Sequence, residues 1–167
     1  MNTQVFCRDC LRAKLKAIQM KLTIRPLETK DQSVWERMFQ AYAEFYKTSV
    51  KDEKLDEVWN WIFDLNNNFW CDIALDKSGN TLGFTQYQLM HRSLSGNTVC
   101  YLSDLYVSPD SRGLGVGKAL IDQVLDFARS RNLSGVRWLT QESNYTARSL
   151  YDKYNKKTDF ILYSLTI

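Results

Sequence analysis

Three glycines within residues 112–118 (Arg-Gly-Leu-Gly-Val-Gly-Lys) separate two regular elements of opposite type. Residues 98–107 before this segment have the β-branched and aromatic composition of a strand, which Pro109 ends because proline cannot continue a sheet ladder. Residues 116–128 after it carry apolar side chains on one helical face. Glycines let backbone amides approach an anion, and the dipole of a helix favours negative charge at its N-terminus. The segment therefore predicts a phosphate site in an α/β domain.

Two common phosphate loops do not fit this segment. A Walker loop that ends at Gly117 and Lys118 needs glycine at position 112 and serine or threonine at position 119, where this chain has Arg112 and Ala119. A dinucleotide fingerprint that starts at Gly113 needs a glycine where the chain has Lys118. A nucleoside triphosphate and a nicotinamide dinucleotide are therefore not the expected ligands.

The periodicity of the rest of the chain predicts a mixed sheet with helices around it. Thr29 followed by Gln32 fits a capping box for the first helix, Asn132 can end the third, and Asn144 is a good N-cap for the fourth. We expect helices over residues 35–46, 55–63, 116–128 and 144–153, and strands over 22–25, 69–75, 81–90, 98–107, 136–140 and 160–167.

What remains of the glycine segment is the pattern Arg-x-x-Gly-x-Gly across Arg112, Gly115 and Gly117. This pattern resembles the coenzyme A pyrophosphate loop of the GNAT (Gcn-five-related N-acetyltransferase) superfamily. Residues 104–109 (Asp-Leu-Tyr-Val-Ser-Pro) look like the central strand of that family. Residues 144–151, with Asn144, Ala147, Leu150 and Tyr151 in their family places, look like its second signature.

The resemblance covers residues 21–167 and is closest to the yeast-type histone and polyamine acetyltransferase subgroup. It implies an α/β (α+β) fold, in which a mixed, mostly antiparallel sheet is splayed at its centre and flanked by helices. One departure concerns residues 154–157, which stand where many members open a longer final hairpin. This departure puts in doubt the dimer geometry and one wall of the substrate site.

The resemblance also assigns a cofactor site. The pantetheine arm of acetyl-CoA is expected to pair with the central strand as an added strand would, and the pyrophosphate is expected on the amides of the loop. Arg112 and Lys118 would add charge-assisted contacts, although both could instead be solvated. The cofactor-binding residues implied in this way are Leu105, Tyr106, Val107, Arg112, Gly113, Leu114, Gly115, Val116, Gly117, Lys118 and Asn144.

Transfer of an acetyl group to an amine needs a base, because a free alkylamine has a pKa near 10 and must be neutral to attack. Asp104 on the cofactor strand is the first candidate, and Glu142 beyond the neighbouring strand is the second, although each could be an ion-pair partner or a substrate anchor. Ser103 is a weaker candidate that would hold a water. Tyr151 matches the family tyrosine that donates to the departing thiolate; the alternative is a core tyrosine. Direct attack leaves the cysteines without a catalytic role.

Charge and composition limit the classes of partner and substrate that this chain is expected to bind. The net charge of +3 comes from residues 1–21, which carry +4, so the remainder carries −1. A slightly acidic body disfavours nucleic acid and suits a cationic substrate. The absence of a long apolar run predicts no membrane partner, and a cytoplasmic location is the default. We expect no metal, because Cys7 and Cys10 lack a second ligand pair; the bland interpretation of the four cysteines is free thiols.

These observations predict an acetyl-CoA-dependent N-acetyltransferase that acts on a primary amine of a small molecule, polyamine-like or amino-acid-like. The alternatives are a non-catalytic acyl-CoA-binding regulatory domain, an acetyltransferase of protein lysines or N-termini, and a nucleic-acid-binding module that uses the basic tail. A homodimer is expected. Residues 1–20 are interpreted as an N-terminal extension, flexible or helical, so that a chain starting at Met20 should keep its fold and turnover.

Overall fold

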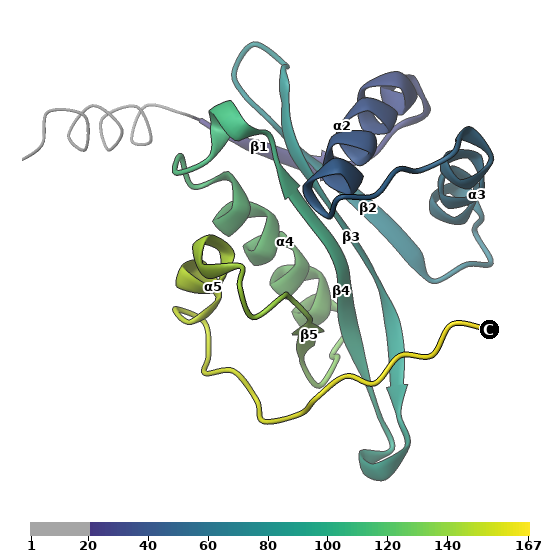
Figure 1. Ribbon diagram of the computed structural model, residues 1–167, viewed down its shortest axis with the longest axis vertical. Coiled ribbons are helices and arrows are strands. Elements are labelled where there is room, and N and C mark those ends of the chain that lie inside the picture. The colour runs from purple at the N-terminus through teal and green to yellow at the C-terminus, as the bar shows by residue number, and fades with distance from the viewer. Residues whose placement is uncertain (1–20) are drawn as a thin grey trace, which may run out of the picture.

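A computed structural model describes residues 21–167, so the predicted extension over residues 1–20 lies outside the described residues. One sheet of five strands forms the centre (Figure 1), in the order β1-β2-β3-β4-β5. Helices α2 and α3 cover one face of the sheet, and α4 and α5 cover the other. The strands are β1 (Thr23–Pro26), β2 (Phe69–Leu75), β3 (Thr81–Arg92), β4 (Asn97–Val107) and β5 (Val136–Trp138). The helices are α2 (Gln32–Phe45), α3 (Asp52–Phe63), α4 (Val116–Ser130) and α5 (Tyr145–Tyr151).

The pairing of the strands confirms the predicted mixed, mostly antiparallel sheet. Strands β1 to β4 form an antiparallel series, and β5 is parallel to β4. The β4–β5 pairing covers only Cys100 to Leu102, whereas β4 continues to Val107. The sheet is therefore splayed beyond Leu102, where β4 runs on without β5.

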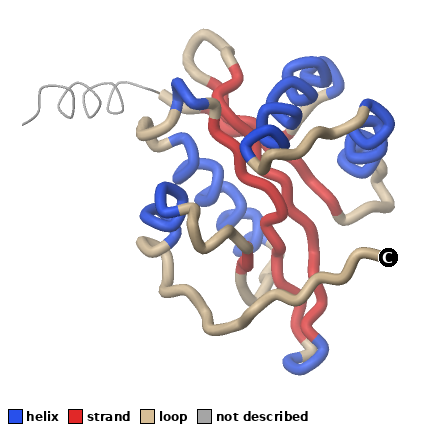
Figure 2. Tube along the Cα trace, in the orientation of Figure 1, coloured by secondary structure: helices blue, strands red, loops and turns tan. Residues whose placement is uncertain are grey.

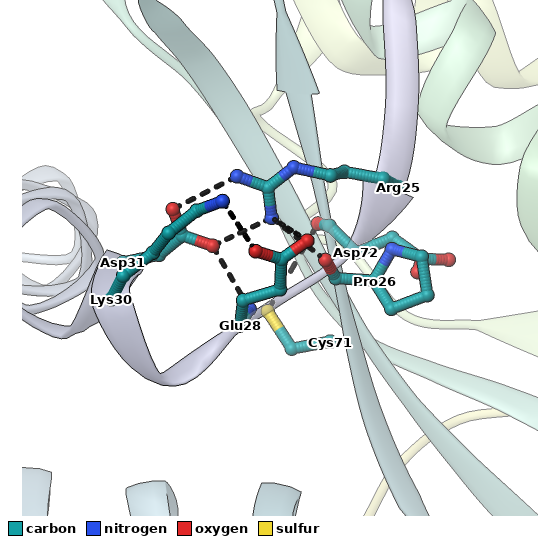
Figure 3. Close-up of polar contacts among 7 residues, drawn as sticks. All are labelled: Arg25, Pro26, Glu28, Lys30, Asp31, Cys71 and Asp72. Atoms are coloured by element: carbon teal, nitrogen blue, oxygen red, sulfur yellow. Dashed lines mark hydrogen bonds and ion pairs between the residues drawn. The ribbon is translucent and has the colours of Figure 1, made fainter.

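The N-terminus of α2 is built differently from the prediction. Residues 29–31 form a 3₁₀ turn, so Thr29 lies inside the turn and not at a cap, and the predicted box of Thr29 and Gln32 is wrong. The backbone N–H of Glu28 instead donates to the carboxylate of Asp31 over 2.9 Å. Arg25 of β1 holds the same carboxylate with bonds of 2.6 and 2.9 Å (Figure 3). This cluster joins β1 to the start of α2.

Each face of the sheet has its own apolar core. On the α2–α3 face, buried side chains of β2, β3 and β4 surround Trp35, which is completely buried. On the other face, Tyr87 and Cys100 pack beneath α4 and α5. Cys71 and Cys100 are buried free thiols, as expected, whereas Cys7 and Cys10 lie outside the described residues. None of the helices within residues 21–167 is long and apolar enough to cross a membrane.

The C-terminal part of the chain departs most from the prediction. Strand β5 ends at Trp138 and not at residue 140, although Asn144 does cap α5 by accepting from the N–H of Ala147. The predicted strand over residues 160–167 is wrong, because this segment forms no strand (Figure 2). Its large apolar side chains are exposed. An alternating pattern becomes a strand only where another strand offers an edge in register.

Candidate active site

A bulge in β4 marks the point where the sheet opens. Gln86 of β3 lies opposite Asp104, and the next residue, Tyr87, lies opposite Leu102, so Ser103 has no counterpart on β3. The pairing with β5 stops at the same place, at Leu102. An extra residue of this kind bends a strand and redirects its side chains. From Ser103 to Val107, the edge of β4 that faces β5 therefore pairs with no strand within residues 21–167. Such an unpaired edge suits the predicted contact with pantetheine.

The glycine loop follows directly on that strand. Gly113 and Gly115 have φ angles of 74° and 87°, which glycine adopts without the steric cost that other residues incur. The first hydrogen bond of α4 runs from the N–H of Ala119 to the carbonyl of Gly115, so the amides of the first turn have no acceptor within the helix. Those amides and the helix dipole favour an anion at this position.

The two cations of the loop contact protein groups. The Nε of Arg112 donates to the carbonyl of Val107 over 3.1 Å, and its guanidinium lies over the ring of Phe45. The Nζ of Lys118 pairs with Asp122 one turn later, at 2.5 Å. Both residues therefore stay next to the loop, and their predicted contacts with phosphate would compete with these partners.

Asp104 lies half-buried on the α2 face of the sheet, and the donors that it meets within residues 21–167 are neutral. Gln86 donates from Nε2 to the Oδ2 of Asp104 over 2.9 Å, and Tyr42 of α2 lies near this carboxylate. Burial raises the pKa of Asp104, and Gln86 and Tyr42 partly oppose that rise. No lysine or arginine within the described part of the chain forms a salt bridge with it. An unpaired carboxylate at the opening of the sheet is suited to receive a cation.

Tyr151 lies in the last turn of α5 and packs edge-on against Trp138 of β5, with 5.5 Å between ring centres. Burial raises the pKa of Tyr151 to about 12, and nearby Tyr46 adds to the rise. Tyr46 packs edge-on against Tyr42, with 5.1 Å between ring centres, and Tyr42 lies near Asp104. Burial and these neighbours raise the pKa of Tyr42 well above its ordinary value. Tyrosines from the end of α2 thus lie between Asp104 and Tyr151.

Sequence reasoning did not single out Tyr42 and Tyr46 as site residues. Both belong to the aromatic stripe of the first helix, most of which is core material. The signal that distinguishes them is the pair of hydroxyl groups at positions i and i+4 of an otherwise apolar stripe, which places both on one side of the helix end.

Glu142 and Asn144 form their polar contacts with residues other than Asp104, Tyr42, Tyr46 and Tyr151. Glu142 lies on the loop between β5 and α5, where it is exposed and pairs with Lys157 at 3.1 Å. That pairing lowers the pKa of Glu142. Asn144 donates to Thr140 as well as accepting from Ala147, so both ends of its amide serve the cap of α5. Ser103, at the bulge, hydrogen-bonds Gln88 over 3.3 Å.

Comparison with known proteins decides the family. The model of the acetyltransferase (GNAT) family matches residues 35–155. The chain belongs to this family. As a member it is an acyltransferase that takes the acetyl group from acetyl-CoA and transfers it to an amine.

Several relatives are similar over most of their length. A D-amino-acid N-acetyltransferase of Saccharomyces cerevisiae, HPA3, is 31% identical over 89% of this chain and 92% of its own. The thialysine N-epsilon-acetyltransferase of Mus musculus is 30% identical over 69% of this chain and 72% of its own. Among solved structures, AAC(6')-Iy in complex with a CoA bisubstrate analogue superposes with a TM-score of 0.75 at 17% identity, covering 87% and 98% of the two chains. This last likeness shows the shared fold.

Proposed function

We propose that this N-acetyltransferase acetylates a small cationic amine, polyamine-like or amino-acid-like, by direct attack of the amine on the thioester of acetyl-CoA. One observation carries the proposal: Asp104 is a half-buried carboxylate beside neutral donors, and no lysine or arginine within residues 21–167 forms a salt bridge with it. Burying an unpaired charge is costly, and a substrate ammonium group would offset that cost when it binds.

The chemistry follows from the roles of Asp104 and Tyr151. Asp104 binds the ammonium group and takes one of its protons, directly or through one water, so that the nitrogen lone pair becomes free to attack. The nitrogen forms a bond with the acetyl carbon, and the bond between that carbon and sulfur breaks. The sulfur leaves with the electron pair and accepts a hydrogen bond from the hydroxyl of Tyr151, while the second proton that the nitrogen loses on forming the amide passes to the thiolate or to water. The raised pKa of Tyr151 keeps this donor protonated at neutral pH.

The relatives support the small-molecule part of the proposal. The yeast relative is named for the acetylation of D-amino acids, and the mouse relative is named for that of thialysine. Another relative is named for aminoglycosides, which are also small amines. In this chain, the aromatic rings of Tyr42 and Tyr46 beside Asp104 offer electron-rich faces that attract cations.

The test is a panel of amines with detection of the released thiol. Polyamines, amino acids of both hands, aminoglycosides and peptides with a free N-terminus or lysine are compared with wild type and Asp104→Asn. Cationic small amines should turn over, and Asp104→Asn should lose about 10²- to 10⁴-fold in kcat/KM. Asp72→Asn is the matched control, since Asp72 is a buried carboxylate that Tyr87 holds beneath α4. Turnover confined to peptides, or full turnover by Asp104→Asn, would contradict the proposal.

We also propose that the enzyme is a homodimer and that residues 160–167 contribute to its interface. This segment exposes six large apolar side chains, namely Phe160, Ile161, Leu162, Tyr163, Leu165 and Ile167. A contiguous exposed apolar surface of this kind is typical of an interaction site.

A further inference from the structure

Two buried side chains behind Asp104 form a directed chain of hydrogen bonds. The Nε1 of Trp35, on α2, donates to the Oε1 of Gln86 over 2.9 Å. The Nε2 of Gln86 then donates to the Oδ2 of Asp104, also over 2.9 Å. Trp35 is 0% exposed and Gln86 1% exposed, so water does not compete for either bond. The chain crosses from α2 through β3 to β4 at the bulge.

The direction of this chain follows from what each group can do. An indole N–H donates and cannot accept, so Gln86 must turn its carbonyl oxygen toward Trp35. Its amino group then has to face Asp104, and an amino group cannot accept. Asp104 therefore always meets a donor on its Oδ2 side, which favours the ionised carboxylate and leaves Oδ1 for other partners.

We propose that Gln86 is a positioning residue for Asp104, with Trp35 fixing the orientation of its amide. The proposal rests on the proposed function, in which Asp104 receives the substrate ammonium group. Gln86 does not contact the acetyl group or the amine. It holds one carboxylate oxygen in place and sustains the negative charge on Asp104 that the amine has to meet.

The other groups around Asp104 carry no positive charge that could replace this donor. Tyr42 on α2 lies near the carboxylate, and Tyr46 packs against Tyr42. Cys71 on β2 and Tyr101 on β4 are near enough for Asp104 to raise the pKa of each. All four are neutral in their protonated forms. Gln86 and Tyr42 are thus the two donors that oppose the effect of burial on Asp104.

The experiment compares Gln86→Met, Trp35→Phe and the double variant with wild type. Methionine keeps the length of the side chain and removes the donor. The readouts are the acid limb of the pH profile of kcat/KM and the KM for the best cationic amine. Gln86→Met should move the acid limb up by about one pH unit, the size expected for one lost hydrogen bond to a charged group, and should raise KM about tenfold. Trp35→Phe should produce a smaller shift in the same direction.

The double variant tests whether the two residues act in series. Once Gln86 is replaced, Trp35→Phe should move the acid limb no further, because Trp35 acts on Asp104 only through the amide of Gln86. Tyr87→Phe is the matched control, because it removes a 2.9 Å bond to the buried Asp72 on the opposite face. It should leave the acid limb in place, whatever it does to the melting temperature.

A measurement on the wild-type enzyme covers the case in which a variant does not fold. In an assigned ¹⁵N spectrum, the side-chain NH₂ of Gln86 should titrate with the same midpoint as the acid limb. A side-chain amide of Gln86 that does not respond to pH, or an acid limb that stays in place in folded Gln86→Met, overturns the inference. Asp104→Asn distinguishes failure of the proposed function from failure of the inference about Gln86. Full turnover by Asp104→Asn would contradict the proposed function. Loss of turnover in Asp104→Asn, together with an unshifted acid limb in Gln86→Met, would contradict only the role of Gln86.

Discussion

Gly83 of β3 lies against the backbone of Tyr106 on β4, so closely that a β-carbon at position 83 would collide with the carbonyl oxygen of Tyr106. In the register of the sheet, Gly83 pairs with Val107, the last residue of β4. The contact is made by β4 itself, the strand that is expected to pair with pantetheine along its other edge. The absence of a side chain at residue 83 therefore determines how closely β3 approaches this strand.

Gly83→Ala should destabilise the protein and weaken acetyl-CoA binding together. The obstacle is backbone and not a movable side chain, so β4 must shift, at a cost of about 1–3 kcal/mol. For a chain of this size, each kcal/mol lowers the melting temperature by roughly 2–4 °C. Gly135→Ala is the control, since no atom lies within 4 Å of its added β-carbon. Unchanged melting and affinity in Gly83→Ala would show that β4 moves freely there.

Gly117→Asp should weaken acetyl-CoA binding without unfolding the protein. A β-carbon at position 117 makes ordinary contacts of 3.5 and 3.6 Å with Leu150 and Val107, so Gly117→Ala is a tolerated control. The aspartate carboxylate would occupy the amides of the first turn of α4 and would repel the pyrophosphate. We expect a loss of roughly 10- to 100-fold in affinity by calorimetry. Gly115 is the poorer choice for this test, because its φ of 87° would strain any other residue.

Much of the structure around the glycine loop could be predicted because its signals are local. Glycine tolerates a positive φ angle, and Gly113 and Gly115 both adopt one. Asn144 caps α5 through atoms only three residues apart. Asn132 adopts a φ of 54° just after α4, as a residue that ends a helix does. None of these features depends on how distant strands align.

The acceptor side could not be predicted to the same extent, because it depends on register. The hydrogen bonds from Trp35 to Gln86 and from Gln86 to Asp104 join residues 51 and 18 positions apart in the sequence. The second bond depends on the register of β3 and β4, which brings Asp104 opposite Gln86 beside the bulge at Ser103. Glu142 shows the opposite outcome: β5 ends at Trp138, so this carboxylate lies on a loop, beside Lys157. Whether either carboxylate is the base stays a prediction.

Asp104→Asn should raise the melting temperature at neutral pH while it removes turnover. Burial raises the pKa of Asp104 in the folded protein above the ordinary value of 3.8. The stability that this group contributes is therefore complete below pH 3.8 and is lost as pH rises through the raised folded pKa. Above the raised folded pKa the ionised carboxylate destabilises the fold, and a neutral amide avoids this cost. The difference in melting temperature between Asp104→Asn and wild type should shrink as pH falls toward 4; a difference that grows on acidification would contradict the argument.

Removal of residues 160–167 should convert the proposed dimer into a monomer. The exposed apolar side chains of this segment would leave the interface, while the sheet and α5 would remain. Light scattering on a sizing column measures the mass of both forms. Leu94→Ser is the control, because Leu94 is also exposed but stands alone in the turn between β3 and β4. A truncated chain that stays dimeric would place the interface elsewhere, and a monomeric full chain would refute the homodimer.

Tyr151→Phe should lower kcat by roughly 10- to 1000-fold, the range of a well-placed proton donor. The pKa of Tyr151 is about 12, whereas a thiol such as that of coenzyme A has a pKa near 8.5. Complete proton transfer from Tyr151 to the thiolate is therefore uphill by about 3.5 pKa units. The hydroxyl acts instead as a hydrogen-bond donor that strengthens as negative charge develops on sulfur. Such a contact matters most in the transition state, so acetyl-CoA affinity should change much less than kcat.

The pH profile separates this role from a structural one. Tyr151 keeps its proton up to about pH 12, so any alkaline limb of the wild-type profile below pH 11 belongs to another group and should persist in Tyr151→Phe. Tyr145→Phe is the matched control on the same helix, because Tyr145 is 73% exposed. The phenylalanine keeps the edge-on packing against Trp138, so the melting temperature should barely move. If Tyr151→Phe retained full kcat under conditions where chemistry limits the rate, water or another group would have to serve the leaving thiolate. If the variant unfolded, Tyr151 would be a core residue and the donor would have to be sought elsewhere.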